Sequence, residues 1–534
     1  MTDERKDVGG DQPAADSPAD WTTMSRRGWL KALVSIPVIG VFVYNFVRKR
    51  AAEATKRQAI MAELGVSERG PAVIPDLISK PPGERLRVGI IGFGGEGEAL
   101  VRHAGFAHPG WVEDARKAVA ENPRDKQLEV YLNQQDLNIA ITAVCDVFDV
   151  RAERGIAASQ VEVRPGGGAL PAAKRYRRYQ DMLQSGDVDA VIIATPDHWH
   201  SRMTMDAVAE GIHVYCEKCM TRTEEEALAM HAAVKASDIV FQLGHQNRAS
   251  ESHNKAREII AANILGPITL VEATTNRNTP WGAWVWDIHE EGNPATIDWE
   301  HFQEPAAHKV PFNLGRFFRW RCWYDYGTGL SGDLLSHEYD AVNQILEVGI
   351  PKSAVSSGGI YYFKDGRDVP DVFQSVFEYP DRDLTVMYSA TLANGRNRSA
   401  VFMGHDASMR VSGSLTVSAD SDSTRYEQKI KDRMIDPSVP MFTYQPGLKG
   451  IDAVTSATEE YFASRGLLYT YQGGRRVSSY HLLIGEWLDV IRNGGQTSCN
   501  IDRGFEEAIT CHMATRSYLE GRRVTWDPVR RRIV

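Results

Sequence analysis

The segments LRVGII (residues 86–91), GFGGEG (92–97) and EALVRHA (98–104) follow one another directly and decide the fold of this chain. A short apolar run of strand length leads into a G-x-G-x-x-G turn and then into a helix-compatible stretch. In such a turn the first glycine permits the tight bend, the second lets a pyrophosphate approach the backbone, and the third lets helix and strand pack closely. We therefore predict a dinucleotide-binding turn made of Gly92, Phe93, Gly94, Gly95, Glu96 and Gly97.

A dinucleotide site also needs an acidic residue at the end of the next strand, and Asp146 follows the apolar segment 138–145. We predict that Asp146 binds the adenosine ribose. It lies about 50 residues beyond the glycines, where about 20 is usual, so we infer an insertion over residues 106–137. A carboxylate here should repel a 2′-phosphate, which favours NAD over NADP; a plain capping aspartate is the alternative.

Three further apolar runs, residues 188–194, 213–216 and 239–243, read as strands of a parallel sheet that is covered on both faces. In an open α/β sheet, ligands bind beyond the carboxyl ends of the strands. The polar residues that follow these runs are therefore expected at the cofactor: Thr195, Pro196, Asp197, His198, His200, Glu217, Lys218 and Gln246.

The glycine turn, TPDHWH (195–200) and EKCMT (217–221) together resemble the Gfo/Idh/MocA oxidoreductases, whose motifs read GxGxxG, TPxxxH and EKP. The resemblance covers residues 85–534 and is strongest with a bacterial branch exported by the twin-arginine route. It implies an α/β protein with a Rossmann domain, a doubly wound parallel sheet, at 85–245. A second α/β domain with a large, open, predominantly antiparallel sheet is implied at 246–534. Cys219 replaces the family's proline, and without a second cysteine pair we expect no metal site.

Asp333 and His337 are four residues apart, so a helix through them places both side chains on one face. Taken alone, such a pair is most simply an exposed helix pair. The resemblance implies instead a catalytic set with Lys218, in which His337 handles the substrate proton, Asp333 orients His337 and Lys218 acts at the reacting oxygen. The residues expected to bind a carbohydrate, although core packing is the alternative for the aromatic ones, are Arg319, Trp320, Trp323, Tyr324 and His337.

The 534 residues carry 61 Lys+Arg against 70 Asp+Glu, a formal net charge of −9, which argues against nucleic-acid binding. Residues 1–24 contain almost no large apolar side chain and are expected to be disordered. Arg26 and Arg27 precede an uncharged run at 32–47, so residues 25–47 resemble a twin-arginine signal, either cleaved or retained as a membrane anchor. Residues 48–84 read as a stalk and linker.

These features predict an exported bacterial enzyme, periplasmic or anchored in the inner membrane facing the periplasm, with the twin-arginine translocase as a partner. We expect a homo-oligomer that transfers hydride between NAD and a sugar, sugar acid, polyol or glycoside. Two alternatives stay open. One is a glycosidase that oxidises its sugar transiently, and the other is a sensor without catalysis, which Lys218, Asp333 and His337 disfavour.

Overall fold

The structure of the protein is a computed structural model that describes residues 83–396, 398–446, 469–472 and 475–534, together with residues 48, 51–52, 55–56, 58–62 and 64–67. The expected disordered tail and the twin-arginine segment lie outside these described residues. The described residues between 48 and 62 are helical. Residues 64–534 form one compact unit.

A six-stranded parallel sheet forms the first half of this unit, as the glycine turn predicts. In spatial order its strands are β3 (Lys174–Tyr176), β2 (Ile139–Cys145), β1 (Leu86–Ile91), β4 (Ala190–Ile193), β5 (His213–Cys216) and β6 (Phe241–Leu243). Of its central strands, β4 is buried along its whole length and β1 is buried from Val88 to Ile91, because helices cover both faces. Five of the observed strands match the predicted runs within about two residues, and the short strand β3 was not predicted.

The helices of this half follow the strands in the order that a doubly wound fold requires. Thr223 and Glu226 form the reciprocal capping box that begins α9, because the Thr223 hydroxyl accepts from the Glu226 N–H. Two helices, α4 and α5, occupy the predicted insertion. The helices are α3 (Gly95–His103), α4 (Pro109–Glu121), α5 (Gln127–Leu132), α6 (Asp149–Ser159), α7 (Tyr179–Leu183), α8 (Asp197–Ala209) and α9 (Glu224–Lys235).

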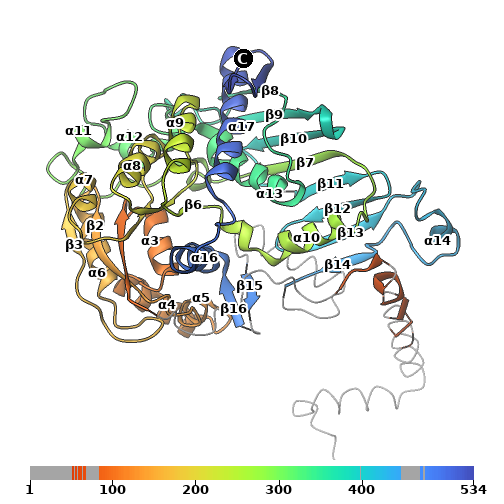
Figure 1. The fold of residues 1–534 in the computed structure, drawn as a ribbon, viewed down its shortest axis with the longest axis horizontal. Helices are drawn as coiled ribbons and strands as arrows, with labels where there is room; N and C mark the ends of the chain where they lie inside the picture. The colour runs from red at the N-terminus through yellow and green to blue at the C-terminus, as the bar shows by residue number, and fades with distance from the viewer. Residues whose placement is uncertain are drawn as a thin grey trace, which may run out of the picture. The chain divides into compact units, whose positions relative to one another are not determined.

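One helix from near the end of the chain returns to this first half. Helix α16 (Ser479–Asn493) lies beside α3 (Figure 1). Its buried side chains Leu483, Ile484, Trp487 and Leu488 join the same core cluster as the side chains of β1 and β2. The assignment of all residues from 246 onward to the second domain therefore misses a helix that completes the core of the first.

The second half is built on a ten-stranded sheet in which β7 and β10 pair in parallel and the other neighbouring strands run antiparallel. This confirms the predicted fold class. The spatial order is β14 (Phe442–Tyr444), β13 (Leu415–Ala419), β12 (Ala407–Val411), β11 (Ala400–Gly404), β7 (Ile268–Asn276), β10 (Leu384–Thr391), β9 (Val372–Tyr379), β8 (Ser353–Gly359), β17 (Val524–Asp527) and β18 (Arg532–Ile533).

Helices cover one face of this sheet, and side chains along β10 alternate between buried and more exposed positions, as that arrangement requires. Figure 1 shows α10, α13 and α17 against the sheet. The main elements here are α10 (Glu251–Ala261), α11 (Trp299–Phe302), α12 (Leu314–Phe318), α13 (Ser336–Leu346), α14 (Glu427–Lys431), α17 (Ile501–Glu520) and the separate hairpin β15 (Tyr469–Gln472) and β16 (Arg475–Ser478).

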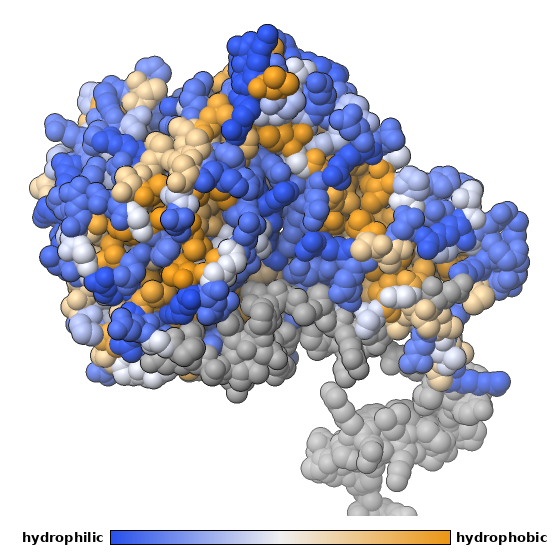
Figure 2. Space-filling model, viewed as in Figure 1, coloured by the Kyte–Doolittle hydropathy of each residue, from blue (hydrophilic) through white to orange (hydrophobic). Residues whose placement is uncertain are grey.

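The face drawn in Figure 2 is mostly hydrophilic, with apolar residues gathered in several separate patches. Within the described part of the chain, no helix has the length and apolar character needed to cross a membrane.

Candidate active site

The glycine turn after β1 holds two kinds of glycine. Gly92 has a φ of +88°, and a Cβ there would lie 2.6 Å from the Ala194 carbonyl oxygen. A Cβ on Gly97 would lie 2.1 Å from the carbonyl oxygen of Gly92. In contrast, a Cβ on Gly95, the first residue of α3, would meet no atom within 4 Å. Gly92 and Gly97 are thus required by the protein's own packing, whereas Gly95 leaves free space before a helix N-terminus, as a pyrophosphate needs.

Asp146, at the end of β2, holds the turn in place. Its carboxylate accepts hydrogen bonds from the backbone N–H groups of Phe93 (2.7 Å) and Phe148 (2.8 Å). Burial raises the pKa of Asp146, and the nearby Arg151 guanidinium partly offsets that rise. Arg151 also lies 3.7 Å from the point where a Cβ of Gly94 would be. A carboxylate and a guanidinium therefore both border the predicted ribose position.

The residues after β4 are mainly directed into the protein. The Asp197 carboxylate accepts from the Thr328 N–H and hydroxyl, at 3.1 and 2.7 Å. The His198 Nε2 lies 2.8 Å from the Phe302 carbonyl oxygen, and the imidazole packs edge-on against the Phe302 ring. Burial lowers the pKa of His198 to about 3. These two side chains, which we predicted at the cofactor, tie the end of β4 to the second half of the molecule.

His200 and the adjacent Thr195-Pro196 pair link the first two predicted loops. The His200 ring lies between the carbonyl oxygens of Cys219 (2.5 Å) and Thr195 (2.8 Å), while Pro196 is the N-cap of α8. The His200 side chain is completely buried. It therefore fixes the distance between the TPDHWH and EKCMT segments.

Glu217 and Gln246, at the ends of β5 and β6, bind each other. The Gln246 side-chain amide donates to the Glu217 carboxylate at 2.8 Å, and the Lys218 N–H donates to the second oxygen at 3.2 Å. Burial raises the pKa of Glu217 well above its usual range. The pair braces the backbone from which the Lys218 side chain departs.

Lys218 and Asp333 form the central contact of the site. The Lys218 Nζ lies 2.7 Å from the Asp333 carboxylate, which also accepts from the Arg321 Nε at 2.8 Å and from the Trp284 indole N–H at 3.0 Å. Burial alone would lower the pKa of Lys218 and raise that of Asp333. The opposite charges outweigh it, so the pKa of Lys218 is raised and that of Asp333 is held well below its usual range.

His337 stands next to this pair but is not oriented by it, which corrects our prediction for Asp333. Asp333 lies in a π-helical turn, Ser331–Leu335, while His337 lies in α13, so the expected regular helix face is interrupted. Within the described part of the chain, His337 makes no hydrogen bond, and its ring packs edge-on against His245 at 5.4 Å. Burial, Lys218 and His245 all lower the pKa of His337, so its imidazole is neutral at pH 7 and free to accept a proton.

The predicted sugar-binding residues divide into two groups. The Arg321 guanidinium lies over the rings of Trp320 (4.2 Å) and Trp286 (5.2 Å), and Arg319 donates to the Trp286 carbonyl oxygen at 2.7 Å. Arg319 and Trp320 therefore lie beside the Lys218–Asp333 pair. Trp323 instead faces Arg316, at 5.1 Å.

Tyr324 is largely buried, and a Cβ on Gly329 would touch its ring. Burial raises the pKa of its hydroxyl. The position of Tyr324 favours core packing against the glycine-containing turn that precedes Asp333 over sugar binding.

Sequence reasoning missed Trp284 and Trp286, although three tryptophans within WGAWVW (281–286) were a visible signal. It also missed Arg277. This residue follows β7, and its charge lowers the pKa of both Asp333 and His337.

Behind His337 lies a buried charge cluster, defined by His245, Arg248, Asp340 and Glu507. Three of its ligand-type atoms, from His245, Asp340 and Glu507, lie within 4.8 Å of one another. However, Arg248 binds Asp340 with its Nε at 2.7 Å, and His245 pairs with Glu507. Glu507 and Asp340 outweigh burial and raise the pKa of His245. Two cations thus match two carboxylates, and we interpret the cluster as an internal salt bridge network.

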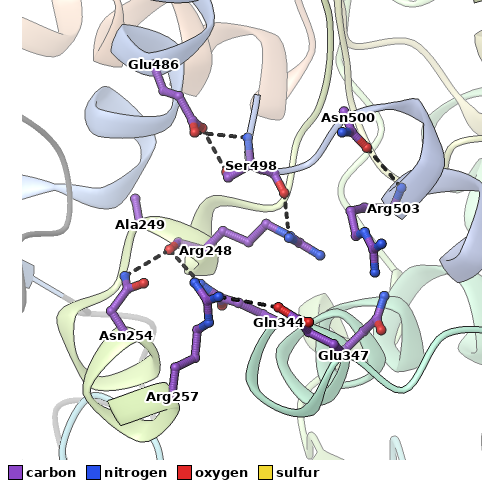
Figure 3. Close-up of a pocket in the computed structure, with 11 residues that line it drawn as sticks. Arg248, Ala249, Asn254, Arg257, Gln344, Glu347, Glu486, Ser498, Asn500 and Arg503 are labelled. Carbon is purple, nitrogen blue, oxygen red and sulfur yellow. Dashed lines mark hydrogen bonds and ion pairs between the residues drawn. The ribbon is translucent and has the colours of Figure 1, made fainter. Parts of the chain in front are cut away.

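Arg248 also reaches a polar cavity of about 420 Å³ (Figure 3). The cavity is bordered by Arg257 from α10, Glu486 from α16, Arg503 from α17 and Glu347, the residue that follows α13. These charges are already used locally: Arg257 pairs with Glu347 at 3.4 Å, and Glu486 accepts from the N–H and hydroxyl of Ser498.

Comparison with known proteins agrees with the glycine turn. Residues 86–245 match the family model described as the oxidoreductase family, NAD-binding Rossmann fold (GFO_IDH_MocA). A levoglucosan dehydrogenase from Pseudarthrobacter phenanthrenivorans is 26% identical over 262 residues, which cover 44% of this chain and 60% of that protein. Glycosyl hydrolase family 109 protein 2 from Shewanella sp. (strain ANA-3) is 30% identical over 189 residues, covering 33% and 34%.

Each of these matches spans less than two thirds of the relative's own length. Among solved structures, levoglucosan dehydrogenase in complex with NADH and levoglucosan superposes with a TM-score of 0.55 at 19% identity. That match covers 83% of this chain and 99% of the other. At this identity the likeness shows a shared fold of both domains, and the family match shows that residues 86–245 form an NAD-binding Rossmann domain.

Proposed function

From the match of residues 86–245 to the NAD-binding Rossmann model of the Gfo/Idh/MocA oxidoreductases, we propose that the protein is a member of this family and acts as an oxidoreductase on a carbohydrate. It transfers hydride between NAD and a hydroxyl-bearing or keto carbon of a sugar, sugar acid, polyol or glycoside. The observation that carries the proposal is the convergence of Lys218, Asp333 and His337 beside the carboxyl ends of the parallel strands.

The bound nicotinamide supplies the hydride acceptor or donor. For oxidation, the neutral ring of His337 accepts the proton of the reacting hydroxyl, while the Lys218 ammonium donates a hydrogen bond to the same oxygen. Asp333 and its partners keep Lys218 charged and in place. Arg321 donates to the same Asp333 oxygen as Lys218, and the Trp284 indole donates to the other oxygen. In the reverse direction, His337 returns the proton to the oxygen.

We propose NAD rather than NADP as the physiological cofactor, because the carboxylate of Asp146, at the end of β2 where the ribose is expected, would repel a 2′-phosphate. Arg151 supplies a cation at the same place, so the preference rests on which of the two charges faces the ribose. Binding of NADH and NADPH to the purified protein decides this. Tighter binding of NADPH would overturn the preference.

The reaction is tested with purified full-length protein, NAD and a panel of sugars, uronates, polyols and glycosides. We expect NADH to appear at 340 nm with at least one member of the panel. Failure of every member to reduce NAD, and of the corresponding keto compounds to oxidise NADH, contradicts the proposal.

A glycosidase with transient oxidation is the second candidate, because a glycosyl hydrolase family 109 protein is among the relatives. It differs in its products. Such an enzyme releases a cleaved sugar from an aryl glycoside without net NADH formation, whereas the dehydrogenase forms one NADH for each oxidised substrate molecule.

We further propose that the protein is exported in folded form by the twin-arginine translocase, either to the periplasm or as an inner-membrane-anchored protein, and that it forms a homo-oligomer. Arg26 and Arg27 beside the uncharged run 32–47 support export. Replacing both by Lys should leave the protein in the cytoplasmic fraction, and unchanged fractionation would contradict export. Light scattering of the purified protein tests the oligomer.

A further inference from the structure

We propose that the substrate carries an acidic group, a carboxylate or a phosphate, which Arg277 and Arg321 bind beside the reacting carbon. This inference rests on the proposed function, because it names the substrate class of the same site.

Arg277 is placed at the reacting centre by two contacts. Thr275, at the end of β7, donates to the Glu338 carboxylate at 3.1 Å and so ties this strand end to the residue after His337. Two residues later, the Arg277 Nη1 donates to the Gly282 carbonyl oxygen at 3.3 Å, and its side chain packs against Gly282. The same loop then delivers Trp284, whose indole binds Asp333.

Arg277 has no carboxylate of its own. Within the described residues it forms no ion pair, although its side chain is half-buried. A desolvated guanidinium is costly without an anionic partner. Its charge reaches Asp333 and His337, yet Asp333 is already held by Lys218 and Arg321. A negative group on the ligand would supply the missing partner.

Arg321 presents the second half of the site. It uses its Nε for Asp333, and the structure shows no other hydrogen bond from this guanidinium among the described residues. Its planar group lies over the rings of Trp320 and Trp286 and is held by the bond to Asp333. A guanidinium fixed in this way, with its outer N–H groups unused, is suited to bidentate binding of a carboxylate or phosphate.

The neighbouring carboxylates do not remove this demand. The charge of Asp197 acts on Lys218 and Arg321, but Asp197 is buried and bonded to Thr328, and Glu96 adds a weaker effect on Arg321. Glu338 is bonded to Thr275, and burial raises its pKa to about 7, which leaves it partly uncharged. The cofactor's own phosphates belong at the N-terminus of α3, on the other sheet, whereas Arg277 follows β7.

Equilibrium binding tests the inference without requiring turnover. Full-length protein saturated with NADH is titrated with matched pairs: D-glucuronate against D-glucose, D-galacturonate against D-galactose, and glucose 6-phosphate as the phosphate arm. We expect at least one acidic member to bind about tenfold or more tightly than its neutral partner. The carboxylate and phosphate arms identify the group.

The variant Arg277→Gln should weaken binding of the acidic sugar about tenfold or more and change binding of the neutral one less than threefold. Arg277→Lys should restore part of the affinity because it keeps the charge. Arg410→Gln, on the exposed side of β12, is the matched control and should change neither.

Equal binding of neutral and acidic partners, an equal effect of Arg277→Gln on both, or no binding of any acidic sugar would overturn the inference. Turnover is read separately. If an acidic sugar binds through Arg277 but no member of the substrate panel reduces NAD and no corresponding keto compound oxidises NADH, the proposed oxidoreductase function is overturned while the acidic subsite stays in place.

Discussion

The glycine turn and the Lys218–Asp333 centre lie in one compact unit but are built in opposite ways. The turn is formed by one continuous stretch of sequence. It leaves free space at Gly95, where a Cβ would meet no atom within 4 Å. The centre brings together side chains separated by 115 residues, and it is crowded with charges that bind one another. A ligand at the glycine turn binds to backbone N–H groups. A ligand at the Lys218–Asp333 centre binds to side chains whose charges are nearly all paired with one another.

This difference implies that substitutions impair cofactor binding and catalysis in different ways. A change in the turn acts through sterics and leaves the charges of the centre intact. A change in the centre disturbs a network in which each group sets the protonation of the next. Substitutions in the two regions should therefore separate affinity for the dinucleotide from turnover.

The largest expected effect is on turnover. Lys218→Ala and His337→Ala should each lower kcat by about 10²- to 10⁴-fold, because each removes a group that handles charge or the proton at the reacting oxygen. The double variant should be little worse than the poorer single one, since both act on the same oxygen. Stopped-flow measurement of hydride transfer checks this, with NADH affinity as the second readout.

The matched controls are Lys352→Ala and His405→Ala, both at exposed positions. They should transfer hydride at the wild-type rate. Near-wild-type transfer by Lys218→Ala or His337→Ala would contradict the assignment of the centre.

The next effect is on stability. Asp333→Asn leaves Lys218 and Arg321 buried without their shared anion, and breaking such a pair costs about 3–5 kcal/mol of unfolding free energy. The pKa of Asp333 is depressed in the folded protein, so its contribution is fully present above the unfolded value of about 3.9 and is lost as the pH falls through the folded value.

Denaturant unfolding at several pH values checks this prediction. The difference between wild type and Asp333→Asn should be complete at pH 7 and shrink in acid below pH of about 4. The control Glu427→Gln removes an exposed ion pair with Lys431 and should have no measurable effect. A variant as stable as wild type at pH 7 would mean that the pair is not desolvated.

A smaller contrast lies within the turn itself. Gly97→Ala forces a Cβ against the Gly92 carbonyl oxygen and should lower the melting temperature and abolish NADH binding. Gly95→Ala meets no protein atom within 4 Å, so the fold should be unchanged while NADH binding weakens about tenfold. Thermal unfolding with and without NADH separates the two. Unchanged NADH affinity in Gly95→Ala would place the pyrophosphate elsewhere.

The smallest effect concerns cofactor choice. The Phe93 and Phe148 N–H groups bind different oxygens of Asp146, so Asp146→Asn keeps an acceptor for only one of them. The variant also removes the negative charge, so Arg151 becomes the dominant charge beside the ribose. The ratio of NADH to NADPH affinity should fall about tenfold, while Asp114→Asn, on an exposed helix, should leave it unchanged. A ratio that does not move would assign Asp146 a purely structural role.

Features written in contiguous residues could be predicted from the sequence. Strand β1 at 86–91 and β5 at 213–216 have the expected bounds, because apolar periodicity and turn residues act locally. The glycine turn follows for the same reason, since its chemistry is complete within six residues.

Features that depend on which segments approach each other could not be predicted. The spacing of Asp333 and His337 suggests a shared helix face. In the structure Asp333 lies in a π-helical turn, and its carboxylate pairs with Lys218 and Arg321 and not with His337. Arg277 carries no local signal of its place at the centre. His198 looks like a ligand in the sequence and is instead an anchor, because its partner, the Phe302 carbonyl oxygen, lies 104 residues away.

The helix α16 has a consequence for how the chain becomes a protein. Its side chains Leu483, Ile484, Trp487 and Leu488 pack in the same core as those of β1 and β2. The core of the nucleotide-binding domain is therefore complete only after residues 479–493 have been synthesised. A nascent or truncated chain that ends before residue 479 leaves that core open to water and its cofactor turn unsupported. Loading of the dinucleotide is thus expected only in chains that have been synthesised beyond residue 493, and a premature stop before residue 479 would disable the first half.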